Sequence, residues 1–366
     1  MKTRFGTGIA AMAVVAATSL LATACGGSSS SSAGTTSLAR SSNVQVCALL
    51  PDTKSSVRYE LFDRPDLSAA FKAAGVKSLI LNAEGDQNTQ RSQADQCITA
   101  GAKVILVDAL NSGVGASIEN NAATNGVKTI DYDRLVLNGK ASYYVSFNNV
   151  AVGRLQGEGV VAGLKANGMY SKKPVVAELN GAPTDNNAKL FKQGYDSVLD
   201  PLYKNGTFVK GPDQSVPNWD NQQALTIFEQ MLTRTNNKID AVAAANDGLA
   251  GAVVTALKDN GLKRIPLSGQ DATPLGVQNI LTGWQTMTVY KPVKMEANAA
   301  AKAAIAILRG QKVATNASVS NGLRKVPSIF LTPISINKRN YTILFRDGVL
   351  KKSEVCVGPV KPFCAA

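Results

Sequence analysis

Two kinds of segment alternate along this chain, and this rhythm constrains the fold more than any other feature. Short apolar runs such as "VQVCALL", "SLILNA" and "KVILVDA" are each followed by a longer amphipathic stretch. These stretches end at glycines, namely Gly75, Gly101 and Gly126. Continuously apolar strands are typical of a parallel sheet that is buried on both faces, and parallel neighbours need a crossover helix. The first series therefore predicts an α/β domain.

A second series of the same kind begins near residue 150. The helical stretch "VAVGRLQGEGVVAGLKANG" precedes the apolar runs "PVVAEL", "IDAVAAA" and "RIPLSG", with helical stretches between them. The chain has 366 residues, of which 45% are hydrophobic, so it is long enough for two packed domains. The remainder, which includes an Ala-rich helix over 294–309 and "SIFLTPISI", is too small for a third domain. We expect it to complete the first two.

The N-terminus predicts export and a lipid anchor. Basic "MKTR" precedes the apolar run "IAAMAVVAATSLLA", and "ATAC" then places small residues before Cys25. This arrangement resembles a bacterial lipobox, in which the cysteine becomes the lipidated first residue, although Ala22 stands where Leu is usual. An ordinary secretory signal with an incidental cysteine is the alternative. The following Gly/Ser tract lacks the apolar surface to fold and is predicted to be a tether.

The other four cysteines fit an oxidising compartment, since an even number outside the cytoplasm suggests two disulfides. Three pairings are possible. Cys356 and Cys364 are close in sequence and could close a small loop, and Cys47 and Cys97 would then join the first strand to a helix. The alternative for Cys47 and Cys97 is that both are buried free thiols.

Several classes of function are disfavoured by composition. The chain contains no histidine, which excludes a Ser-His-Asp triad and histidine metal ligands. The net charge is +13, but the basic residues are scattered, so we interpret them as a solvated surface rather than a nucleic-acid site. No segment after the leader has 18 unbroken apolar residues, and no further membrane span is expected.

Polar side chains follow the predicted strands at the points where the strands end. They are Asp52, Lys54, Arg58, Tyr59, Asp133, Arg134, Asp185, Asn186, Asn187, Asn246, Asp247, Gln270 and Asp271. In open parallel sheets, ligands bind at the carboxyl ends of the strands. One such cluster is explained by helix capping, since Asp and Asn are favoured N-caps. Their recurrence in both series predicts two polar faces that point toward each other across a cleft.

These residue types suggest a polyol as the ligand. Carboxylates, amides and Arg can exchange pairs of hydrogen bonds with adjacent hydroxyls, and Tyr59 and Trp219 could stack on the C–H face of a sugar ring. A phosphate is less suited to this mixed-sign set, and the glycine loop GxxxxGK[ST] is absent. For Trp219 the alternative is a packing residue beside a helix start, because Asp220 is itself a plausible N-cap.

Taken together, these motifs resemble a known family. "LLPDTKSSVRYELFDRP", "IDYDRL", "YYVSFNNVAVGRLQGE", "NGAPTDNNAKLF", "VPNWDNQQAL", "NNKIDAVAAANDGLAGA", "SGQDAT", "QTMTVYKPV" and "VPSIFLTPISI" occur in order over about residues 46–336. They resemble the periplasmic-binding-protein type I sugar receptors, and most closely the D-xylose-binding proteins of ABC importers. Each stretch alone is weak, but together they are specific.

The resemblance implies two Rossmann-like, doubly wound lobes joined by a three-crossover hinge, with the sugar between them. The implied divisions are a signal peptide (1–24), a lipid-anchored tether (25–43), an N-terminal lobe (44–147 plus about 274–325), a C-terminal lobe (148–273 plus about 326–355) and a tail (356–366). By matching position, the implied ligand-binding residues are Lys54, Arg58, Tyr59, Asp133, Arg134, Asn186, Trp219, Asn246, Asp247, Asp271 and Lys291. Tyr59 replaces a usual Trp and Asn148 a usual Asp, and the loop before Asp63 is longer.

The resulting hypothesis is a monomeric, lipid-anchored extracytoplasmic receptor that needs no cofactor. It would bind a monosaccharide by lobe closure and pass it to an ABC permease. A receptor that feeds a membrane sensor remains open. A glycoside hydrolase using Asp133 and Asp247 is disfavoured, because Arg134 and Lys291 would keep the carboxylates ionised. A transcriptional regulator would need a helix-turn-helix where the signal peptide stands.

Overall fold

The computed structural model describes residues 43–364. The predicted signal peptide, the predicted lipidation site Cys25 and nearly all of the predicted tether lie outside these residues. Among the helices that the structure describes, none has the length and apolar character needed to cross a membrane.

The first sheet has seven strands in the order β10-β11-β5-β4-β3-β1-β2. All neighbours are parallel except the edge pair β10–β11. The strands are β1 (Val46–Leu50), β2 (Ser78–Asn82), β3 (Val104–Val107), β4 (Lys128–Tyr132), β5 (Tyr143–Phe147), β10 (Ala317–Ser320) and β11 (Lys325–Leu331).

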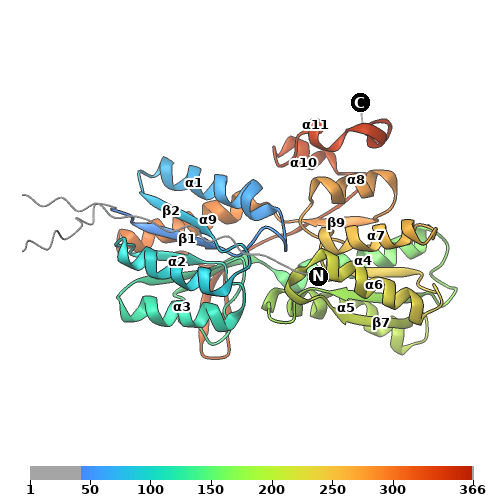
Figure 1. Ribbon diagram of the computed structural model, residues 1–366, viewed down its shortest axis with the longest axis horizontal. Helices are drawn as coiled ribbons and strands as arrows, with labels where there is room; N and C mark the ends of the chain where they lie inside the picture. Colours follow the sequence, from blue (N-terminus) through green and yellow to red (C-terminus); the bar gives the residue numbers. More distant parts are fainter. Residues whose placement is uncertain (1–42, 365–366) are drawn as a thin grey trace, which may run out of the picture. The chain divides into compact units, whose positions relative to one another are not determined.

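Helices cover both faces of this sheet, as the apolar runs predicted (Figure 1). Successive side chains of a strand point to opposite faces. Val46, Ala48 and Leu50 therefore pack with α1 (Arg64–Ala73) and α9 (Val293–Leu308). Cys47 and Leu49 pack instead with α2 (Gln87–Thr99) and α3 (Ser112–Thr124). On that second face Cys47 forms a disulfide with Cys97 of α2, so this predicted pair is present.

The second sheet is built from β6 (Val175–Asn180), β7 (Val209–Ser215) and β8 (Ala241–Ala244), in the order β7-β6-β8. Parallel bridges extend it from Val242 to Leu267 and from Gln270 to β9 (Met287–Tyr290). β12 (Ile334–Asn337) pairs antiparallel with β9. Its helices are α4 (Asn149–Ala166), α5 (Asn186–Lys204), α6 (Asn221–Arg234), α7 (Asp247–Asp259) and α8 (Pro274–Thr282).

Helices α4 and α5 cross with almost no space between their backbones. A Cβ atom on Gly153 would lie 1.9 Å from the carbonyl oxygen of Phe191, and one on Gly194 would lie 2.3 Å from that of Val150. Only glycine permits this approach. The crossing holds the start of α5, and with it the residues that precede α5, against the start of α4.

The predicted two-lobed α/β fold is confirmed, but the strand pairing corrects the predicted boundaries. α8 and β9, assigned above to the N-terminal lobe, belong with the second sheet. β11, assigned to the C-terminal lobe, pairs with β5 in the first sheet. The chain thus passes between the sheets after β5, after β9 and after β11. Lys291 lies in the second of these crossovers.

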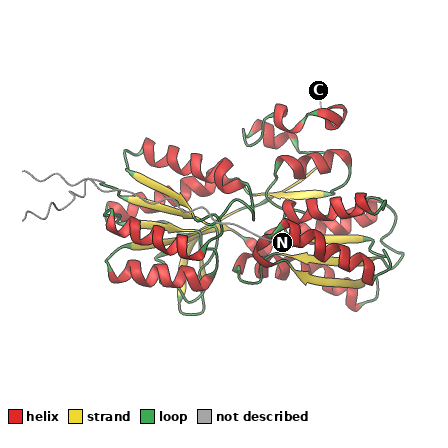
Figure 2. Cartoon of the chain, viewed as in Figure 1, coloured by secondary structure: helices red, strands yellow, loops and turns green. Residues whose placement is uncertain are grey.

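The C-terminal segment packs on α8 (Figure 2). It consists of α10 (Thr342–Arg346), α11 (Lys352–Val355) and a 3₁₀ segment (Gly358–Phe363). Leu344, Leu350 and Val355 join Val277 and Leu281 of α8 in one apolar cluster. The predicted disulfide Cys356–Cys364 closes the end of this segment.

A buried pair of carboxyl groups holds the loop between β4 and β5. Asp131 accepts a hydrogen bond from the amide of Val136 at 3.0 Å, and Glu119 accepts one from the amide of Ala141 at 2.6 Å. Burial raises the pKa of both groups, and the charge of Glu119 raises the pKa of Asp131 further. Both shifts favour the protonated form of these carboxyl groups. The same loop carries Asp133 and Arg134.

Candidate functional site

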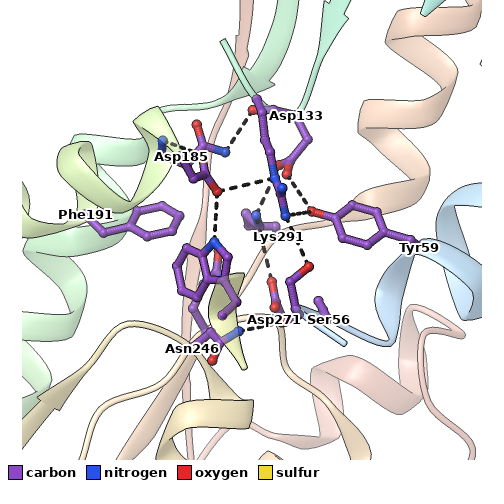
Figure 3. Close-up of a pocket in the computed structure, with 13 residues that line it drawn as sticks. Ser56, Tyr59, Asp133, Asp185, Phe191, Asn246, Asp271 and Lys291 are labelled. Carbon is purple, nitrogen blue, oxygen red and sulfur yellow. Dashed lines mark hydrogen bonds and ion pairs between the residues drawn. The ribbon is translucent and has the colours of Figure 1, made fainter. Parts of the chain in front are cut away.

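The strands of the two sheets end at one common cavity (Figure 3). The space between its lining residues, including the part that is open to solvent, is about 270 Å³. Apart from Phe191 in the second turn of α5, each lining residue follows the carboxyl end of a strand or lies at the start of the next helix. The lining residues are Ser55, Ser56, Tyr59, Asp133, Arg134, Asp185, Asn187, Phe191, Trp219, Asn246, Gln270, Asp271 and Lys291.

Asp133 lies directly after β4 with a φ of 57°, a left-handed conformation that turns the chain sharply. Its Oδ1 lies 3.2 Å from both Nη1 of Arg58 and Nζ of Lys291, and its Oδ2 accepts a hydrogen bond from the hydroxyl of Tyr59 at 3.2 Å. Burial alone would raise the pKa of Asp133, but the charges of Arg58, Lys291 and Arg134 outweigh it and hold the pKa well below its usual range. Asp133 is therefore a permanent acceptor.

Arg58 is not among the residues that line the cavity, and its role in ligand binding stays a prediction. It belongs to the turn before the π-helical segment Tyr59–Asp63 and is 1% exposed. Its guanidinium holds Asp63 through Nε at 2.9 Å and Nη2 at 2.7 Å, and Nη2 also lies 2.8 Å from Glu296 of α9. Arg58 thus positions Asp133 from behind and joins the first loop to α9.

Arg134 connects the two lobes. It donates to the side-chain oxygens of Ser55 at 3.2 Å and Tyr59 at 3.1 Å. Its Nε lies 3.3 Å from Oδ2 of Asp185, which precedes α5 in the second lobe. Asp185 is the N-cap of α5, because its Oδ1 accepts from the amide of Asn187 at 2.8 Å. The carboxylate that begins this helix therefore also belongs to the site.

Two aromatic rings form one wall of the cavity. Trp219 and Phe191 meet edge to face, with ring centroids 6.4 Å apart, and the indole Nε1 donates to Asp185 at 3.1 Å. The indole also lies against the backbone of Gly181, where a Cβ atom would be 2.0 Å from the ring. Trp219 is therefore both a packing residue, as the alternative interpretation expected, and a residue that lines the cavity.

Unpartnered acceptors lie on the second lobe. Asp271, with a φ of 99°, has its Oδ1 buried without a hydrogen bond among the described residues, and the nearest cation, Nζ of Lys291, is 3.8 Å away. Oε1 of Gln270 is likewise buried and lacks a hydrogen-bond partner in the described part of the chain. Asn246 is better satisfied, because it caps α7 through Oδ1 and donates from Nδ2 to the carbonyl of Ser55 at 2.8 Å.

Three further predicted residues lie away from the lining. Lys54 is exposed and Asn186, the first residue of α5, is half-buried, and neither borders the cavity. Asp247 lies behind it, where Thr273 and Gln285 donate to its carboxylate at 2.8 Å each. Burial raises the pKa of Asp247 to about 7.

The other predicted residues meet at the cavity as expected; they are Tyr59, Asp133, Arg134, Trp219, Asn246, Asp271 and Lys291. The ligand set implied by the family resemblance omitted Ser55, Ser56, Asp185, Asn187, Phe191 and Gln270, although Asp185, Asn187 and Gln270 were among the polar residues predicted at the cleft. Several of these carried a signal, since Asp185, Asn187 and Gln270 follow strand ends in the sequence. Phe191 had none beyond its place in an amphipathic helix.

The residues that line the cavity offer three kinds of interaction. The carboxylates and carbonyl groups accept hydrogen bonds, Arg134 and Lys291 donate them, and the Trp219–Phe191 wall offers an aromatic surface. Among the described residues, no group of His, Cys, Asp and Glu side chains could hold a metal ion.

Comparisons with known proteins agree with this architecture. The model of the periplasmic binding protein domain matches residues 47–312. The D-xylose-binding periplasmic protein of Escherichia coli is 38% identical over 295 residues, covering 80% of this chain and 87% of the relative. The multiple sugar-binding periplasmic receptor ChvE of Rhizobium radiobacter is 31% identical over 319 residues, covering 82% and 89%.

Solved structures show the same arrangement of elements. An ABC transporter solute binding protein of Clostridium phytofermentans with bound β-D-glucose superposes with a TM-score of 0.79 at 27% identity, covering 85% of this chain and 99% of that one. A carbohydrate transporter solute binding protein of Chloroflexus aurantiacus in complex with D-glucose gives a TM-score of 0.76 at 29% identity, covering 84% and 97%.

Proposed function

This chain belongs to the periplasmic binding protein family, and on that premise we propose that it is an extracytoplasmic receptor for a monosaccharide. D-Xylose or a related pentose or hexose is the proposed ligand, held between the two lobes and delivered to an ABC permease. The relatives named for D-xylose and for multiple sugars support the ligand class, as do the two similar structures that contain glucose.

The observation that carries this proposal is the combination of unpartnered acceptors and an aromatic wall in one cavity. Buried polar groups are almost always hydrogen-bonded, so Asp271 Oδ1 and Gln270 Oε1 need a donor. Sugar hydroxyls are such donors, and the Trp219–Phe191 wall matches the C–H face of a pyranose ring.

The proposed mechanism is closure of the lobes around the ligand. The cavity is lined from both lobes. The first lobe contributes Asp133, Tyr59 and Ser55, and the second contributes Trp219 and Asn246. A sugar bound there would bridge the two lobes. Binding to both faces favours the closed arrangement by its differential affinity. In the closed arrangement the two lobes also contact each other directly, through the ion pair Arg134–Asp185 and the hydrogen bond Asn246–Ser55.

We propose that the receptor makes and breaks no bond. A glycoside hydrolase needs a carboxyl group that is protonated near neutral pH, beside a second carboxylate. Asp133 is surrounded by Arg58, Lys291 and Arg134, which keep it ionised. Asp247, its partner in the enzyme hypothesis, does not border the cavity.

Calorimetric titration of the detergent-solubilised full-length protein tests the proposal. We expect at least one sugar among D-xylose, L-arabinose, D-ribose, D-glucose and D-galactose to bind with submillimolar affinity. If none of them binds at millimolar concentration, the proposed function is wrong. Incubation with aryl β-xylosides and β-glucosides should release no phenol; release would favour the enzyme hypothesis.

A further inference from the structure

A second and larger pocket adjoins the cavity, and the proposed function does not use it. It leaves about 1170 Å³ free of atoms, against about 270 Å³ for the cavity. Its apolar lining comes from Val57 and Leu61 of the first loop and from Pro274 and Leu275 at the start of α8. Polar residues, among them Lys54, Asp220 and Asp247, complete the lining, and we refer to the whole pocket as the vestibule.

The vestibule and the cavity are neighbours with a thin partition. Ser55, Ser56, Asn246 and Asp271 line both. Between the lobes, the partition includes the 2.8 Å hydrogen bond from Nδ2 of Asn246 to the carbonyl oxygen of Ser55. Oδ1 of Asn246 is committed to the amide of Leu249 at the start of α7. If a substituent on the bound sugar displaced this interlobe hydrogen bond, the substituent could extend from the cavity into the vestibule.

The side chains of the vestibule indicate what such a substituent would be. Leu61 and Leu275 are each 53% exposed and Val57 is 43% exposed, so three of the few large apolar side chains that are exposed in the described chain gather here from both lobes. No aromatic ring lines the vestibule. A second sugar ring would thus lack a stacking surface, whereas an apolar group would cover the leucines and gain free energy in proportion to the area.

We propose that the vestibule binds the apolar aglycone of an O-glycoside whose sugar occupies the cavity. This inference rests on the proposed function, since the sugar must bind first. Because the two pockets adjoin, an aglycone on the bound sugar would lie in the vestibule. Leu61 and Leu275 come from different lobes, so covering both of them with the aglycone would also favour lobe closure.

The test compares glycosides that differ only in the aglycone. Methyl and phenyl glycosides of D-xylose and of D-glucose, in both anomers, are titrated calorimetrically into the full-length protein beside the free sugars. Covering about 60 Å² of apolar surface strengthens binding about tenfold. We expect one phenyl glycoside to bind at least about fivefold more tightly than its methyl counterpart. In the double variant Leu61→Ser/Leu275→Ser this advantage should fall below about twofold, while affinity for the free sugar is unchanged.

Leu323→Ser is the matched control, because Leu323 is 59% exposed and lines neither pocket; it should keep the phenyl advantage. The inference is overturned if phenyl and methyl glycosides bind equally, if the advantage survives in the double variant, or if free sugar binds and no glycoside does. It is also overturned if the double variant binds every ligand normally but loses sugar uptake in cells, which would assign the leucines to a protein partner. If no free sugar binds, the proposed function itself fails.

Discussion

Asp271 offers the sharpest test of the proposed site. Its Oδ1 is buried without a hydrogen bond among the described residues, and Lys291 Nζ at 3.8 Å is too far away to supply one. A ligand hydroxyl would supply the missing donor. Asp271→Asn keeps the shape of the side chain but removes the charge of the acceptor. Asn is also preferable to Ala here, because the φ of 99° lies in a region that Asn tolerates better.

A hydrogen bond to a charged group contributes about 1.5–3 kcal/mol. Asn still offers a neutral acceptor oxygen, whose hydrogen bond contributes about 0.5–1.5 kcal/mol. Asp271→Asn should therefore cost about 1–1.5 kcal/mol and weaken binding of the best sugar in the panel by about five- to 13-fold, since 1.4 kcal/mol corresponds to a factor of ten. The Tm without sugar should change little, because Lys291 keeps its 3.2 Å contact with Asp133. Calorimetry gives the affinity, and a thermal melt without sugar gives the stability.

Asp259→Asn is the control for the charge change, since Asp259 is an exposed residue at the end of α7. It should bind sugar as wild type does. If Asp271→Asn binds within about twofold of wild type and melts normally, Asp271 does not receive a ligand hydroxyl and the reasoning is refuted. A large drop in Tm would show that the carboxylate stabilises the fold instead.

Three further predictions concern stability and location. Replacing both Cys47 and Cys97 by Ala should lower the free energy of unfolding by about 2–4 kcal/mol in a denaturant titration, because the disulfide closes a loop with a sequence separation of 50; no change would show that the bond contributes nothing. Asp131→Asn should flatten the decline of stability above about pH 4, because burial raises the pKa of Asp131 in the folded chain above its value in the unfolded chain; an unchanged pH profile of Tm would contradict the raised pKa. Cys25→Ser protein should leave the membrane fraction, and an unmodified Cys25 in the mass spectrum of wild-type protein would exclude the anchor.

The fold class and much of the site were predictable because they depend on local patterns. Apolar runs alternate with amphipathic stretches, and that rhythm alone specifies parallel strands with crossover helices. Asp133, Asn246 and Asp271 directly follow strand ends, and the carboxyl ends of parallel strands share one edge. Position along the chain was therefore enough to place them at the cavity.

Tertiary structure decided which neighbouring side chain faces the ligand. Asp185 reaches the cavity from the extended N-cap position and Asn187 from the first turn of α5, whereas Asn186 between them does not line the cavity. Arg58 lies beside Tyr59 in sequence but turns away to Glu296, a partner 238 residues distant. The pattern of a strand likewise does not specify its partner, which is why β11 was assigned to the wrong lobe. Local periodicity determines the kind of element and where it ends, whereas direction and pairing depend on contacts between segments far apart in the chain.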